Sequence, residues 1–83
     1  MKAVLNKISR HPSKFGGDFY YLFFKTEKGE SCKSCVSPAY RNWSNWAEIV
    51  KNFDETHPIL LENLIYRNGL IDADSKPQKV KEE

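Results

Sequence analysis

A run of six aromatic and apolar residues, FYYLFF at positions 19–24, constrains the fold of this chain more than any other feature. The run has the length of a strand and is rich in the residue types that favour strands. Glycine-containing polar segments flank it at 13–18 and 27–30, as expected for a strand that lies between two turns. The sequence therefore predicts a β-strand at residues 19–24.

Period-two alternation predicts two further strands, at residues 3–9 and 31–36. The segment at 10–12 (RHP) ends the first of them, and 13–18 is expected to be a loop. A short turn that contains Gly29 suits a hairpin between the second and third strands. The third strand is therefore expected to pair antiparallel with the second.

The period becomes helical after Pro38, which ends the third strand. The helix is expected to finish before residues 57–58 (HP). One apolar stripe with the spacing of an amphipathic helix contains Trp43, Trp46, Ala47, Val50 and Phe53. Because both tryptophans lie on this stripe, we assign them to the core and not to ligand binding.

Two more strands are predicted after the helix, at residues 59–66 and 70–71, with a type I′ turn at 68–69 (NG) between them. Residues 76–83 carry too little apolar surface to fold and are predicted to be a polar, disordered tail. A chain of 83 residues has room for one compact core only. Residues 1–75 are therefore expected to form a single domain.

The predicted order is strand, strand, strand, helix, strand, strand. This order resembles that of the OB-fold, a five-stranded barrel in which a helix lies between the third and fourth strands. The resemblance covers nearly the whole chain and rests on element order, without a sequence motif. It implies a mainly β, α+β barrel of OB-fold type whose second and third strands bind oligonucleotides. An SH3-like barrel is the alternative, although it would more often lack the helix.

Charge is distributed unevenly along a chain whose net charge is only +2. Residues 1–47 contain eight basic and three acidic side chains, whereas residues 48–83 contain five basic and eight acidic ones. Most of the aromatic residues also lie in the basic half, a combination typical of surfaces that bind single-stranded nucleic acid. An ordinary solvated surface would explain the same distribution.

No feature of the sequence predicts a membrane or secreted location. The N-terminal residues lack the apolar stretch of a secretory signal, and no segment approaches the length that spans a bilayer. Two cysteines are too few for the disulfide framework of a small secreted domain. A cytoplasmic protein without a membrane partner is therefore expected.

Neither catalysis nor a metal site is predicted. Cys32 and Cys35 form a CxxC pair, but on a strand they face opposite sides with their Cα atoms about 10 Å apart, too far for a disulfide. Zinc would need two further ligands, and the two histidines lie at spacings that match no common site. The DxD sequence at 72–74 more often caps a turn than binds a metal. No nucleophile, base and orienting group can be combined, so we expect neither an enzyme nor a cofactor or small-molecule substrate.

Alternation along residues 19–24 places odd-numbered and even-numbered side chains on opposite faces, and the lysine at 25 indicates that the odd-numbered face is outside. The residues predicted to bind nucleic acid on this face and on the next strand are Phe19, Tyr21, Phe23, Lys25 and Lys33. Further candidates in the first loop and before the helix are Arg10, Lys14, Phe15 and Arg41. Arg41 could instead cover a tryptophan ring through a cation–π contact. If both faces of the strand at 19–24 were packed against other parts of the chain, no binding surface would remain.

The favoured hypothesis is a non-enzymatic module that binds single-stranded DNA or RNA through aromatic stacking and lysine–phosphate contacts, with little sequence preference. The alternative is a protein-interaction module, such as an accessory or inhibitory subunit, or self-association through the same aromatic face. Aromatic residues beside lysines favour nucleic acid. The low net charge and the acidic second half favour a protein partner.

Overall fold

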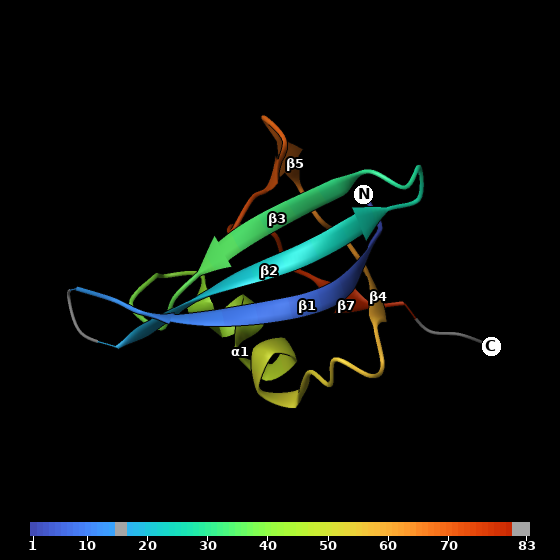
Figure 1. The fold of residues 1–83 in the computed structure, drawn as a ribbon. Coiled ribbons are helices and arrows are strands. Elements are labelled where there is room, and N and C mark those ends of the chain that lie inside the picture. The colour runs from blue at the N-terminus through green and yellow to red at the C-terminus, as the bar shows by residue number, and fades with distance from the viewer. Residues whose placement is uncertain (15–16, 81–83) are drawn as a thin grey trace.

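A curled sheet with one helix against it forms the fold in the computed structural model, which describes residues 1–14 and 17–80 (Figure 1). Strands β1 (Ala3–Pro12), β2 (Asp18–Thr26) and β3 (Ser31–Val36) pair in sequence order as an antiparallel meander. The remaining elements are α1 (Trp43–Asn52), β4 (Ile59–Glu62), β5 (Tyr66–Arg67), β6 (Leu70–Ile71) and β7 (Gln78–Lys79). The prediction of a mainly β fold with one helix is confirmed.

The strands that follow the helix join both edges of the meander. The order across the sheet is β5-β6-β3-β2-β1-β4-β7, with β4 antiparallel to β1 and β6 parallel to β3. The sheet curls into a half-barrel, and strands from the second half of the chain form both of its edges (Figure 1). The described residues contain seven strands, so the predicted number of five is wrong.

One extra strand arises because the predicted strand at 59–66 is broken at Asn63. Asn63 adopts a φ of 65°, a left-handed conformation that asparagine tolerates better than most residues. Leu64 is then buried, and β5 begins at Tyr66 as half of a hairpin with β6. Positive φ values at both central residues of that hairpin, residues 68 and 69, confirm the predicted type I′ turn.

Strand β1 is longer than predicted, since residues 10–12 extend it instead of ending it. His11 pairs with Phe19, and Pro12 pairs with Asp18 at the end of the ladder. The neighbouring β4 pairs with β1 only near the start of the strand, so Pro12 has no partner strand on that side. A proline that ends a strand with one free edge removes little hydrogen bonding, which explains why RHP did not terminate the strand.

The C-terminal segment also differs from the expected disordered tail. Gln78 and Lys79 form β7 along the outer edge of β4, and the Val80 amide donates to the Leu60 carbonyl oxygen at 3.1 Å. Backbone pairing needs no apolar side chains, so the polar composition of this segment did not predict it. Residues 81–83 of the predicted tail lie outside the described residues. Within the described chain, no helix is long and apolar enough to cross a membrane.

The helix covers the concave side of the sheet and completes the core. Trp46 is fully buried, and its Nε1–H donates to the Ala73 carbonyl oxygen at 2.8 Å. Trp43 stacks on Tyr20 with ring centroids 5.6 Å apart. The assignment to the core is therefore confirmed for Trp46, and Trp43 is partly buried against that core. Ile49 is buried beside them although the predicted stripe did not include it.

Candidate functional site

The two faces of β2 differ as the alternation predicted. Leu22 and Phe24 point into the core and are almost completely buried. On the opposite face, Phe23 is 37% exposed, Phe19 and Tyr21 are half-buried, and the side chain of the next outward residue, the lysine at 25, is exposed. The convex face of the sheet therefore presents three aromatic rings along one strand.

Strand β3 adds its own outward residues to this face. Its register with β2 places Lys33 directly opposite Phe23 and Cys35 opposite Tyr21. The Lys33 Nζ lies 5.2 Å from the centroid of the Tyr21 ring, a cation–π contact made diagonally across the two strands. The expected grouping of lysines with aromatic rings on the β2–β3 surface is thus present in the structure.

Strand β1 contributes a third row of residues that the sequence prediction missed. A β-bulge between Leu5 and Lys7 shifts the alternation of β1 by one residue. As a result, Lys7 pairs with Phe23 and points outward. Further along, His11 stacks on Phe19 with centroids 5.4 Å apart, and its Nε2 lies 2.8 Å from the Ser9 Oγ. The alternation of residues 7, 9 and 11 was the available signal, but it was lost when the first strand was predicted to end at residue 9.

Three adjoining hollows lie along these residues on the face. The largest, about 600 Å³, is lined by Lys14, Phe19, Tyr21 and Tyr40 among others. Two smaller hollows of about 270 and 320 Å³ share Tyr21 or Phe23 with the rest of the face and extend it past Lys33 to Leu70. We call this feature the β2–β3 groove and define it by Lys14, Phe19, Tyr21, Phe23, Lys33, Cys35, Tyr40 and Leu70. Tyr40 and Leu70, both exposed, were not predicted.

Charge on this face has one sign. The outward positions of the described strands β1, β2 and β3 between residues 7 and 35 include Lys7, Lys25 and Lys33 and no carboxylate. The acidic side chains of the first half are Asp18 at the start of β2 and the two glutamates of the β2–β3 turn, and the others lie in the second half of the chain. The groove therefore combines aromatic surface with positive charge, which suits an anionic ligand that carries flat rings.

The other predicted candidates do not all reach the groove. Lys14 lines its broad end. Arg10 pairs with Tyr20, so its side chain lies on the opposite face of β1 from the groove. Its Nε is 3.6 Å from an Asp18 carboxylate oxygen in a solvent-exposed ion pair. Arg41 is exposed in the turn before α1 and does not line the groove. The fourth candidate, Phe15, lies outside the described residues.

The cysteines and the DxD sequence take structural roles. Cys32 is buried and Cys35 faces the groove, and burial raises the pKa of both thiols, which keeps them protonated near neutral pH. Asp72 accepts a hydrogen bond from the Asp74 amide at 2.8 Å and lies 3.3 Å from Arg67. No cluster of three metal-ligating side chains occurs among residues 1–14 and 17–80. These aspartates thus cap a turn.

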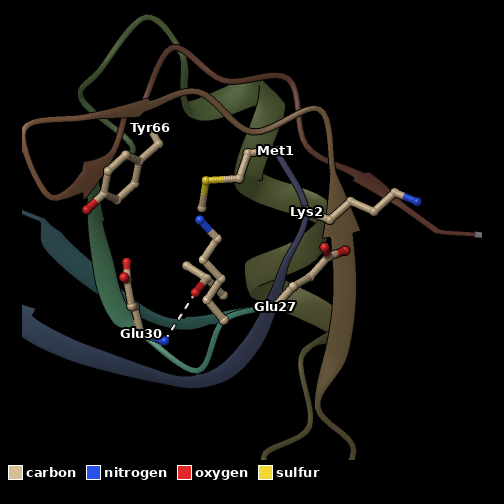
Figure 2. A pocket seen from close by; sticks show the side chains of 7 residues that line it. Met1, Lys2, Glu27, Glu30 and Tyr66 are labelled. Atoms are coloured by element: carbon tan, nitrogen blue, oxygen red, sulfur yellow. Dashed lines mark hydrogen bonds between the residues drawn. The ribbon is translucent and has the colours of Figure 1, made fainter.

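A separate hollow of about 350 Å³ lies beside the β2–β3 turn (Figure 2). Two carboxylates, those of Glu27 and Glu30, border it together with Lys2, Lys28 and the exposed ring of Tyr66. The two carboxylates in this lining repel an anionic ligand, whereas the groove has none among its lining residues. The hollow is therefore a poorer candidate for a polyanion than the groove.

Comparison of the chain with protein-family models, with curated proteins and with solved structures gave no match. Function is therefore inferred from the groove itself. Its described side chains supply flat rings and ammonium groups.

Proposed function

We propose that the chain is a non-enzymatic module that binds single-stranded DNA or RNA in the β2–β3 groove. The observation that carries the proposal is the placement of Lys33 over Tyr21, next to Phe19 and Phe23, on a face without carboxylates between residues 7 and 35 of its strands. Bases stack on aromatic rings, and the phosphates that link them attract ammonium groups. One groove that offers both kinds of contact fits a flexible polyanion with exposed bases.

The spacing of the rings favours a single strand. Outward residues of a strand are about 6.6 Å apart, so Phe19, Tyr21 and Phe23 extend over about 13 Å. A duplex keeps its bases stacked inside, whereas the bases of a single strand can turn outward to meet successive rings. Because every base has a flat face, stacking of this kind implies little sequence preference.

The order of the elements supports an OB-fold-like barrel as part of the same proposal. A three-stranded meander precedes the helix, and the later strands join both of its edges. OB-folds bind oligonucleotides on the face of their second and third strands, between flanking loops. The corresponding flanks are the segment that contains Lys14 and the β5–β6 hairpin with Leu70.

A protein partner is the second candidate, and the far end of the groove favours it. Leu70 is 47% exposed and lies with Phe23 around one hollow, so this end is more apolar than the lysine-bordered centre. Exposed apolar surface of this kind often marks a protein contact. The test of nucleic-acid binding decides between the two candidates.

Fluorescence anisotropy of labelled oligothymidylate and oligouridylate, titrated with the protein at low and moderate salt, tests the proposal. We expect salt-sensitive binding that Phe19→Ala weakens by about 5- to 150-fold, the cost of one lost stacking partner. Tyr66→Ala is the matched control, because Tyr66 is also a solvent-accessible ring, 45% exposed, and it lies outside the groove.

Two results would contradict the proposal. Absence of binding even at low salt would leave a protein partner as the better explanation of the groove. Equal weakening by Phe19→Ala and Tyr66→Ala would mean that the oligonucleotide binds away from the β2–β3 groove.

A further inference from the structure

Lys33 occupies a position where a base would have to stack. Its ammonium group lies over the Tyr21 ring, 5.2 Å from the centroid. The same ring already meets Phe19 and His11, whose centroids are 5.2 and 5.3 Å away in edge-to-face geometry. Lys33 comes from β3 and His11 from β1, so neighbours on both adjacent strands enclose Tyr21. Access of a base to Tyr21 therefore depends on what Lys33 does.

Exchange of the ammonium group for a base is energetically favourable. An exposed cation–π contact corresponds to about two- to five-fold in an equilibrium constant, whereas a stacked base corresponds to about 5- to 150-fold. The lysine side chain is exposed and has a flexible stem, so its departure from the ring requires no change in the backbone. An ammonium group released beside a stacked nucleotide is also close to that nucleotide's phosphate.

We propose that an incoming base displaces Lys33 from Tyr21 and that the lysine then pairs with the adjacent phosphate. This inference rests on the proposed function and adds a role for one residue. Before binding, Lys33 shields the central ring of the groove and holds it in place. After binding, the same side chain neutralises the backbone charge that the base brings with it.

The exchange gives Lys33 two opposing effects on affinity. Its phosphate contact helps most at low salt, because each neutralised phosphate of a single strand adds about 0.7 to the slope of log affinity against log salt. Its contact with Tyr21 opposes binding by about two- to five-fold at every salt concentration. Removal of the charge should therefore weaken binding at low salt and strengthen it at high salt.

Salt titrations of Lys33→Met and of the wild type, with oligothymidylate as the probe, measure both effects. We expect the slope to fall by about 0.7 and the two affinity curves to cross at about 0.1–0.4 M salt, where the two effects balance. Lys25→Met is the matched control. Lys25 is exposed on the same face as Lys33. The two lysines differ in that Lys33 makes the cation–π contact found among the described residues. Because Lys25 does not line the groove, its curve should lose at most the same slope and should not rise above that of the wild type below about 1 M salt.

An NMR measurement follows the displacement directly. In the free protein, the ring current of Tyr21 should move the ε-CH₂ signals of Lys33 upfield, an effect that Tyr21→Leu abolishes and Tyr21→Phe retains. Addition of oligothymidylate should remove the upfield shift in the wild type. This readout needs no variant at Lys33.

The outcomes separate the two proposals. If the oligonucleotide binds but the Lys33 signals stay upfield and the affinity curves do not cross, Lys33 remains on the ring and the exchange is refuted, while the proposed function survives. Absence of the upfield shift in the free protein also refutes the exchange. If no oligonucleotide binds at low salt, the proposed function fails and the exchange fails with it.

Discussion

Replacement of Trp46 by phenylalanine tests the packing that joins the helix to the sheet. The indole is fully buried, donates to the Ala73 carbonyl oxygen at 2.8 Å and meets the Phe24 ring with centroids 6.2 Å apart. Loss of the hydrogen bond costs about 1 kcal/mol. The smaller ring leaves part of the space empty, which costs about another 1 kcal/mol. We expect the free energy of unfolding to fall by about 2 kcal/mol.

Far-UV circular dichroism measures this loss without dependence on the tryptophan fluorescence that the substitution removes. For a domain of this size, 1 kcal/mol lowers Tm by about 4–8 °C, so Trp46→Phe should lower Tm by about 8–16 °C. Trp43→Phe is the matched control. Trp43 is only half-buried and stacks on Tyr20, and phenylalanine retains that stacking. Its expected loss is below about 1 kcal/mol.

The comparison of the two variants decides the outcome. Equal losses for Trp46→Phe and Trp43→Phe would show that the buried hydrogen bond to Ala73 does not distinguish the two tryptophans. A negligible loss for Trp46→Phe would refute the packing described for the helix.

Two further predictions concern the edge of the sheet and the loop after the helix. Truncation after Lys76 removes β7 and its pairing with β4. The free energy of unfolding should fall by about 1 kcal/mol, which lowers Tm by about 4–8 °C in a thermal melt. An unchanged Tm would show that β7 adds no stability. Hydrogen bonds from the Thr56 amide and hydroxyl, and then from His57, lower the pKa of Asp54 below its ordinary value of 3.8. The stability from these bonds is complete above pH 3.8 and is lost as the pH falls through the lower pKa of the folded state. The Tm of the wild type should therefore approach that of Asp54→Asn in acid. A Tm difference that does not depend on pH would contradict this origin.

Local features of the sequence predicted the parts of the fold that depend on near neighbours. The alternation at 19–24 assigned the two faces of β2, because successive side chains of a strand point to opposite sides. Helical spacing placed Trp43 and Trp46 against the sheet. The dipeptide at 68–69 specified its turn, since asparagine and glycine accept the positive φ that the turn requires.

Several boundaries depended on strands far away in the chain. Residues 10–12 join β1 because β2 pairs with them, and residues 78–79 form β7 because β4 offers a free edge. Residues 10–12 continue the alternation of β1 only as far as His11, and residues 78–79 have no pattern that distinguishes a strand from a loop. The break at Asn63 likewise divides an apolar segment that looked continuous in sequence.

A period of two residues is enough to predict which face of β2 carries rings and lysines. The residues that complete the groove depend instead on how the strands pair and on how the later segments fold back. Cross-strand register placed His11 beside Phe19, and the fold placed Tyr40 and Leu70 at its two ends. The pairing register of the strands and the position of the segments after the helix are set by contacts between residues far apart in the sequence. A local pattern of residues does not specify such contacts.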